Sequence, residues 1–282
     1  MRGAYYELDH TVSHGDVDLV GEFKVRAVLG LLERAAVEAS AALGFDAEWY
    51  TESRCLWVVR RTRMQRHRAL GGRDRLTLHT WVEDFRRARS LRRYAIHCNG
   101  ESEPALTAST DWVYCDAISG RPRRVPEEME RAFSGDAASL PTLARAAAVE
   151  SPDPTTGHHS ARRVRASDLD HVAHVNNGIW ANYLEDAAEE WLAENGWPLP
   201  AMLEAGGAFR LAALDLEYVA EGFSGDELRI HSAAEAPLAD ARRTPFALRQ
   251  EIHKADGSLA LRARSEWDWL ERPAVLGAPP RR

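Results

Sequence analysis

One short segment of the sequence concentrates side chains that can do chemistry. Residues 167 to 177 read Ser-Asp-Leu-Asp-His-Val-Ala-His-Val-Asn-Asn, which gathers a carboxylate at Asp170, an imidazole at His174 and amides at Asn176 and Asn177. Carboxylates and imidazoles are the usual general bases and acids, and a carboxylate can also act as a nucleophile. The residues that follow have the pattern of a helix, whose first backbone N–H groups can stabilise negative charge. The segment is therefore a candidate active-site loop.

A second copy of this loop, lacking most of those side chains, occurs earlier in the chain. A shift of 152 positions pairs Asp168 with Asp16 and Asp170 with Asp18 and needs no gap as far as Gly44 and Gly196. A match at a fixed period indicates a duplicated structural unit. The first copy places Glu22 opposite His174, Lys24 opposite Asn176 and Val25 opposite Asn177. If one copy kept a site while the other drifted, the second copy is the one that kept it.

Each copy predicts one helix followed by strands. Apolar residues recur at helical spacing over 25–43 and 179–192, and each run ends at a glycine suited to a left-handed cap. Apolar residues then alternate with polar ones, which predicts strands with one buried face. One long helix followed by strands with short turns indicates an α+β fold, with an antiparallel sheet wrapped on the helix. We expect a first copy over 1–125, a linker with a short helical piece over 126–160, and a second copy over 161–282.

Composition limits the class of protein. The 282 residues are 45% hydrophobic and 28% charged, which excludes disorder over most of the length. No stretch is apolar enough to span a membrane or to act as a secretory signal, so we expect a cytoplasmic protein. A net charge of −7 argues against a dedicated nucleic-acid binder. Three cysteines without metal-type spacing predict neither disulfides nor a zinc site.

The loop and the later segment Leu-Glu-Tyr-Val-Ala-Glu-Gly at 216–222 together resemble the acyl-ACP thioesterases, a family of tandem double hotdogs. The resemblance covers most of the chain. It includes the duplication, the helix positions, the segment Gly-Arg-Pro-Arg-Arg-Val-Pro at 120–126, the pattern Asp-x-x-x-His-Val-Asn-Asn, and Tyr183 downstream. It implies that each copy is a hotdog and that the second one is catalytic.

The resemblance also assigns roles to individual residues. The loop carboxylate of the family falls on Asp170, its catalytic histidine on His174, and the glutamate of the following strand on Glu221. Two positions depart from the family: Val172 replaces a loop asparagine that would orient the carboxylate or the water, and Gly222 replaces a cysteine once proposed as a nucleophile. A thiol nucleophile is therefore excluded at residue 222.

Hydrolysis of a thioester needs an activated water or a carboxylate nucleophile, and hydrogen-bond donors for the developing oxyanion. We expect Asp170 to be the nucleophile or the base and Glu221 to help activate water. His174 is expected to polarise or orient the water or the thioester carbonyl. Asn176, Asn177 and Gly178 are expected to form or orient the oxyanion site, and Gly178 to let substrate approach the backbone. A structural alternative remains for each residue, because aspartates and asparagines are also ordinary helix caps.

Two further sites follow from the resemblance and from local composition. The first copy is expected to house the acyl tail, and Trp57, Trp180 and Tyr183 are candidates for an apolar slot, although such aromatic residues usually just pack in a core. The arginine cluster is a candidate docking surface for an acidic carrier protein, with solvated surface as the alternative. Its members are Arg86, Arg87, Arg89, Arg92 and Arg93.

The sequence thus predicts a thioesterase that releases a fatty acid from acyl carrier protein, without a metal or nucleotide cofactor. Acyl-CoA thioesterase, hotdog hydratase or dehydratase, and non-catalytic acyl-thioester binder are the alternatives. A fused pair of hotdogs is compatible with either a monomer or a homodimer.

Overall fold

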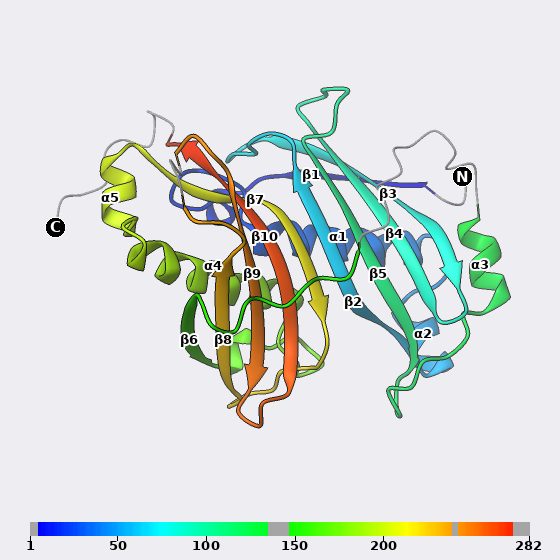
Figure 1. Ribbon diagram of the computed structural model, residues 1–282. Coiled ribbons are helices and arrows are strands. Elements are labelled where there is room, and N and C mark those ends of the chain that lie inside the picture. The colour runs from blue at the N-terminus through cyan, green and yellow to red at the C-terminus, as the bar shows by residue number, and fades with distance from the viewer. Residues whose placement is uncertain (1–4, 135–146, 239–241, 273–282) are drawn as a thin grey trace. The chain divides into compact units, whose positions relative to one another are not determined.

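The computed structural model describes residues 5–134, 147–238 and 242–272, and the chain divides into two units. The first unit contains residues 1–12 and 30–147, and the second contains 13–29 and 148–282 (Figure 1). The early loop at residues 13–24 and the first turn of the helix that follows it are therefore grouped with the second unit, although they belong to the first sequence copy.

The first unit is built on an antiparallel sheet with the strand order β1-β3-β4-β5-β2. The edge strand β1 alternates between exposed and less exposed side chains, with Leu8 buried, whereas β4 and β5 inside the sheet have runs of five consecutive buried residues. The bounds are β1 Tyr5–Thr11, β2 Cys55–Arg66, β3 Arg75–Arg86, β4 Arg89–Cys98 and β5 Leu106–Asp116.

The second unit repeats this sheet strand for strand. Its order is β6-β8-β9-β10-β7, and all of these neighbours are antiparallel. The bounds are β6 His158–Arg163, β7 Gly207–Tyr218, β8 Glu227–Ala234, β9 Phe246–Lys254 and β10 Leu259–Glu271. Because the two orders correspond element by element, the duplication read from the sequence is a duplication of topology.

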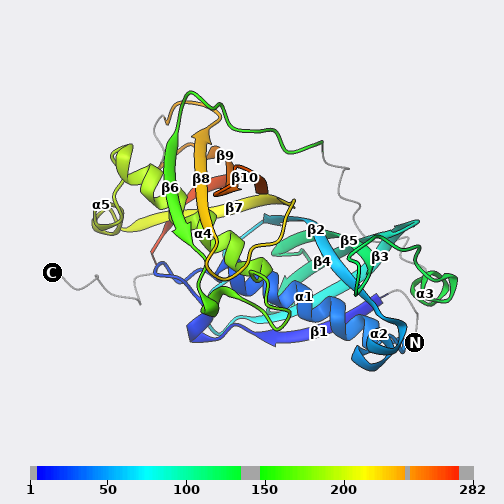
Figure 2. The same ribbon diagram turned by 90° about the horizontal axis from the view of Figure 1, so that it is seen from below.

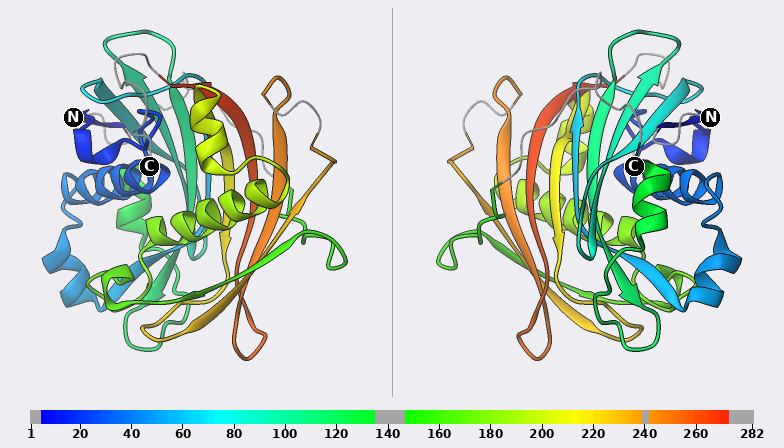
Figure 3. Two further views of the ribbon diagram at one scale, coloured as in Figure 1. Left: turned by 90° about the vertical axis from the view of Figure 1, so that its left-hand side faces the viewer. Right: turned by 90° about the vertical axis from the view of Figure 1, so that its right-hand side faces the viewer.

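A long helix accompanies each sheet. In the first copy α1, Val25–Ala41, buries Val28, Leu32, Ala35 and Ala39, which lie on one helical face. Figure 2 shows α1 running along the strands of the first unit. In the second copy α4, Asn177–Glu194, crosses one face of its sheet (Figure 3). Gln250 Nε2 on β9 donates to the Leu184 carbonyl of α4 at 3.0 Å, which fastens that helix to the sheet.

Glycines close both long helices as the sequence predicted. Gly44 and Gly196 have φ of +90° and +89°, a conformation that side-chain-bearing residues rarely adopt. The chain turns back at each glycine, so that Phe45 N donates to the Ser40 carbonyl and Trp197 N to the Leu192 carbonyl. This is the usual way to satisfy the last carbonyls of a helix.

The remaining helices are short: α2 Ala47–Ser53, α3 Glu127–Phe133 and α5 Leu199–Glu204. The segment interpreted as a linker contains α3, and it also contains the first residues of β6, since His158 and His159 pair with β8. The three cysteines are buried and free, as expected. None of the helices in the described parts of the chain is long and apolar enough to cross a membrane.

Candidate active site

Asp170 holds the candidate loop in shape through its own backbone. Its Oδ1 accepts hydrogen bonds from Val172 N at 3.0 Å and His174 N at 3.3 Å, and its N–H donates to the His174 carbonyl at 2.9 Å. The loop is therefore a tight turn around one carboxylate oxygen. The other oxygen, Oδ2, accepts no hydrogen bond from the described residues, which leaves it available to a water or a carbonyl carbon.

Asp168 fastens both ends of the loop. Its Oδ2 accepts from Arg165 N at 2.7 Å and from the Tyr183 hydroxyl at 2.8 Å, while its carbonyl accepts from Asn176 N at 2.9 Å. Tyr183 lies on α4, so this contact ties the loop to the helix. Burial raises the pKa of Tyr183, and the hydrogen bond to Asp168 raises it further, so the phenol remains a donor.

A backbone contact places Glu221 next to His174. Val175 N donates to the Gly222 carbonyl at 2.9 Å, which brings the segment after β7 against the loop. His174 Nδ1 then lies 3.5 Å from Glu221 Oε1, with the His174 side chain 33% exposed and that of Glu221 54% exposed. The ring of Phe223 meets the His174 ring edge-on at 5.1 Å. The histidine therefore has a carboxylate on one side, an aromatic ring on another, and access to solvent.

The start of α4 provides one unused backbone donor. Asn176 caps the helix: its Oδ1 accepts from Gly178 N at 3.0 Å and its carbonyl accepts from Ile179 N at 2.9 Å. Within the described residues the Asn177 N–H has no acceptor. Of the residues expected to form an oxyanion site, Asn177 offers a backbone N–H and Asn176 orients the helix end.

Gly178 has a different role from the one expected. A Cβ at this position would lie 2.9 Å from Arg26 Cγ and 3.1 Å from the Arg26 carbonyl oxygen, both in the first turn of α1. The space that a side chain at residue 178 would take is therefore occupied by the first turn of α1. Close approach of that turn, not of a substrate, is what the glycine permits.

Packing also explains the glycine that replaces the family's cysteine. A Cβ on Gly222 would come within 2.8 Å of both Trp180 and Val175. Trp180 is buried at 3% exposure and meets the ring of Tyr183 edge-on. Because Trp180 fills this space, residue 222 is limited to glycine in this packing.

The three aromatic residues proposed for an acyl slot do not belong to one unit. Trp180 and Tyr183 are buried in the second unit, and Trp57 lies in the first, half-buried, where its Nε1 donates to the Tyr50 hydroxyl at 3.0 Å. Tyr183 serves the loop through its hydroxyl, a role that the sequence analysis did not predict. The sequence does contain a signal for this role, because the shift of 152 positions places Leu31, which has no hydroxyl, opposite Tyr183.

The arginine cluster divides into exposed and buried members. Arg92 and Arg93 are only 6% and 2% exposed, so the prediction that these two dock a carrier protein is wrong. As consecutive residues of a strand they point to opposite faces, and both are buried because β4 is covered on both faces, as the unbroken burial of residues 92–96 shows. Arg86 pairs with Asp84 and Arg89 with Asp111 on the surface, while the exposed Arg87 pairs with no carboxylate among the described residues.

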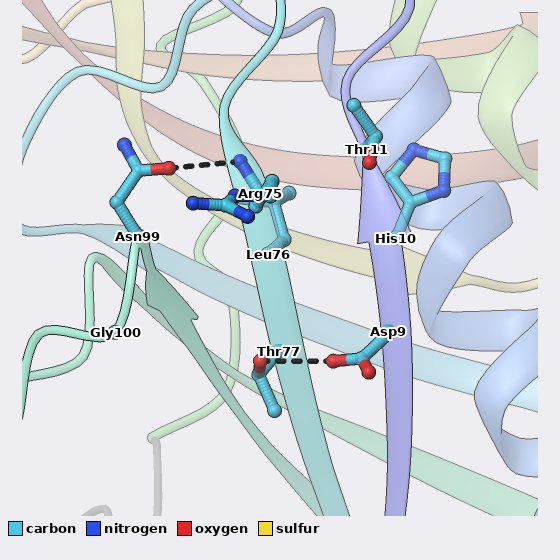
Figure 4. Close-up of a pocket in the computed structure, with 8 residues that line it drawn as sticks. All are labelled: Asp9, His10, Thr11, Arg75, Leu76, Thr77, Asn99 and Gly100. Carbon is cyan, nitrogen blue, oxygen red and sulfur yellow. Dashed lines mark hydrogen bonds between the residues drawn. The ribbon is translucent and has the colours of Figure 1, made fainter.

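A surface pocket of about 470 Å³ lies elsewhere, on β1, β3 and the turn after β4. Figure 4 shows that its polar groups bind one another: Thr77 donates to Asp9, and Arg75 N donates to Asn99. None of the predicted site residues lines it. In the described residues no group of three or more His, Cys, Asp or Glu side chains is arranged to hold a metal ion.

Family models match both copies of the chain. Residues 3–133 match the acyl-ACP thioesterase N-terminal domain, and residues 164–267 match the thioesterase-like superfamily. The chain belongs to the acyl-ACP thioesterase family. The thioesterase is thus a thiolester hydrolase of the kind that serves fatty acid biosynthesis.

Solved structures resemble the thioesterase over nearly its whole length. An acyl-ACP thioesterase from Bacteroides thetaiotaomicron matches with a TM-score of 0.76 at 17% identity, over 93% of this chain and 97% of that one. The 12:0-ACP thioesterase from Umbellularia californica gives 0.73 at 17% identity, over 94% of each chain. A protein described as an oleoyl thioesterase from Lactobacillus plantarum gives 0.75 at 18% identity, over 96% and 98%. The fold is accordingly the expected α+β double hotdog. A comparison with curated proteins found no match.

Proposed function

We propose that the thioesterase hydrolyses acyl-[acyl carrier protein] to a free fatty acid and the carrier protein, at the loop between Asp168 and Asn177. The observation that supports this most directly is the His174–Glu221 contact, made by a histidine of the loop that is folded around Asp170 Oδ1. A carboxylate can activate water or attack the thioester, an imidazole can orient the water or the carbonyl, and a helix N-terminus can stabilise the oxyanion.

In the proposed reaction, Asp170 Oδ2 is the base that takes a proton from water, or the nucleophile itself. If Asp170 is the base, the water oxygen adds to the thioester carbonyl, the C–S bond breaks, and the departing pantetheine sulfur takes up the proton that Asp170 had accepted. If Asp170 is the nucleophile, its Oδ2 adds to the carbonyl and the thiolate leaves and takes a proton from water; hydrolysis of the resulting acyl anhydride then releases the fatty acid and restores the carboxylate. His174 orients the attacking water or the carbonyl and is held by Glu221. The Asn177 N–H at the start of α4 stabilises the oxyanion, a contribution of about 3 to 4 kcal/mol for a well-placed donor.

The carrier protein is acidic and needs a basic surface. Of the arginines considered, Arg87 is the exposed one that the described residues leave without a carboxylate partner. We place carrier docking at Arg87 and its exposed neighbours Arg86 and Arg89, since opposite charge accelerates association. In the same proposal, the first unit accommodates the acyl chain.

The proposal is tested by release of free thiol from acyl carrier protein. His174→Ala is expected to lower the rate at least about 100-fold, the scale of a positioned acid–base group. His171→Ala is a matched control, because His171 lies in the same loop with its side chain exposed. We expect it to keep the wild-type rate.

The same acyl group is then offered on CoA. Faster turnover on CoA than on the carrier protein would replace the substrate assignment with acyl-CoA. Equal rates for wild type and His174→Ala, with both proteins folded, would remove the proposed site. Addition of water without thiol release would indicate a hydratase.

A further inference from the structure

The interior of the first unit contains a charged side chain. Arg92 lies on β4, the central strand of the sheet, and is 6% exposed. Its β3 neighbour in register is Val82, a member of the buried cluster that also includes Phe133 of α3. Arg92 therefore occupies a position in the sheet where a hotdog core is expected to be apolar.

The buried positive charge of Arg92 has few partners that could compensate it. Its Nη1 donates to Thr80 Oγ1 at 3.3 Å, and the guanidinium stands over the Phe133 ring at 5.2 Å. Within the described chain no carboxylate pairs with it, whereas the next residue, Arg93, is paired with Glu83. Burial lowers the pKa of Arg92, and the tyrosines Tyr94 and Tyr50 offset this only in part.

A second polar group lies on the same face of β4 two residues further on. The Tyr94 hydroxyl is buried and makes no hydrogen bond of good geometry in the described residues, although Thr110 and Trp112 lie near enough to interact with it. The nearby Tyr50 hydroxyl is already engaged, since it contacts Ser40 Oγ at 2.9 Å and accepts from Trp57 Nε1 at 3.0 Å. Two buried groups of one strand, a cation and a phenol, therefore lack adequate partners.

The surroundings of this pair are aromatic. Half-buried side chains packed against the cluster include Trp49, Tyr50, Trp57 and Phe85. Such a lining suits a hydrocarbon chain, but hydrocarbon offers nothing to a guanidinium or a phenol. Unpaired buried charge destabilises a fold, and its retention is understandable where a ligand supplies the missing partner.

We infer that the first unit binds acyl chains that carry an oxygen remote from the thioester, above all a carboxylate, and that Arg92 and Tyr94 are the residues that bind this oxygen. The inference rests on the proposed function, since the acyl chain is the ligand that this unit would receive. A carboxylate matches Arg92 in charge and geometry and can accept from Tyr94 as well.

The test compares acyl-carrier substrates of one chain length with and without a terminal carboxylate. The wild type is expected to prefer the carboxylated chain at least about tenfold, the effect of one hydrogen bond to a charged group. Arg92→Met, which has an apolar side chain of similar reach, is expected to abolish that preference. Arg34→Met is the matched control, because Arg34 is an exposed residue of α1 paired with Glu38, and the preference should persist.

A binding measurement separates this inference from the hydrolytic activity. Thermal stabilisation by a fatty acid methyl ester is compared with that by the monomethyl ester of a dicarboxylic acid of equal length. We expect the monomethyl ester of the dicarboxylic acid to stabilise the wild type more than the fatty acid methyl ester does. In Arg92→Met and Tyr94→Phe this additional stabilisation should be smaller. Tyr94→Phe also serves if Arg92→Met fails to fold.

The outcomes are distinguishable. Absence of thiol release from every substrate overturns the proposed function, while the binding measurement still decides the role of Arg92. Equal binding of the two esters by the wild type, or a carboxylate preference that survives in the variants, overturns the inference and leaves hydrolysis intact.

Discussion

The loop that we propose to be catalytic, called the catalytic loop below, and its counterpart in the first copy have the same backbone hydrogen bonds but different side chains. In the counterpart, Asp18 Oδ1 accepts from Val20 N and Glu22 N, both at 2.9 Å, and Asp18 N donates to the Glu22 carbonyl at 2.8 Å. These are the bonds that Asp170 makes in the catalytic loop. The carbonyl of Asp16 likewise accepts from Lys24 N at 2.8 Å. An aspartate in this position is therefore first of all a loop-forming residue.

The side chains set the two loops apart. Where the catalytic loop has His174 beside Glu221, the counterpart has Glu22, buried at 3% exposure, with its Oε2 3.2 Å from Arg210 Nη1. Arg210 also pairs with Asp268 at 2.8 Å. Burial lowers the pKa of Arg210, but Asp268 and Glu22 outweigh it, so the pKa is raised. One loop presents a partly exposed imidazole, and the other ends in a buried ion pair.

The turn residue of each loop differs as well. Gly21 has φ of +86°, and Ala173, the corresponding residue of the catalytic loop, has φ of +63°. A left-handed alanine costs about 1 to 2 kcal/mol, which glycine avoids. The catalytic copy thus keeps the more strained turn, next to His174.

The largest expected difference in activity is between variants of Asp170 and of its counterpart Asp18. Asn keeps the Oδ1 acceptor, so Asp170→Asn and Asp18→Asn should both preserve the loop. We expect Asp170→Asn to lower kcat/KM for thiol release at least about 100-fold, because the base or nucleophile is lost. Asp18→Asn should retain the wild-type value. If both variants remain active, Asp170 only shapes the loop, as Asp18 does, and the base lies elsewhere.

A smaller effect is expected at Tyr183, which has leucine as its counterpart. Tyr183→Phe removes the bond that ties Asp168 to α4, a contribution of about 1 kcal/mol. We expect kcat to fall roughly five- to tenfold with KM unchanged, because loop position and not binding is affected.

Tyr6→Phe is the control for this variant, because Tyr6 also donates to a carboxylate, that of Glu38 at 3.1 Å, in the first unit. Loss of activity through a rise in KM alone would argue that Tyr183 contacts substrate instead of positioning the loop.

The smallest effect on catalysis is expected at the buried ion pair. Glu22→Gln should leave the rate unchanged and lower the free energy of unfolding by about 1 to 2 kcal/mol, since Asp268 still neutralises Arg210. Chemical denaturation measures this. The exposed pair of Glu227 with Arg163 provides the control, and Glu227→Gln should change stability by well under 1 kcal/mol. A loss of activity in Glu22→Gln without a change in stability would mean that the first loop takes part in the reaction.

Much of the site was predictable because duplication supplies an internal standard. Comparing His174, Asn176 and Asn177 with their counterparts singled out the loop, and the same comparison at Tyr183 would have found the loop clamp. The arginine cluster was less tractable. Which of five nearby arginines are buried depends on what covers each face of β4, and only the packed structure shows that both faces are covered at Arg92 and Arg93.

Sequence alone determined the fold class and the duplication and supplied the candidate reactive groups, because helical and strand periodicities and a loop motif are local properties of the chain. The tertiary structure decided which oxygen of Asp170 is occupied, which carboxylate stands beside His174, what fills the space before Gly178, and where an uncompensated cation is buried. Those facts depend on contacts between segments far apart in sequence, and such contacts are fixed only when the sheet and helices have packed.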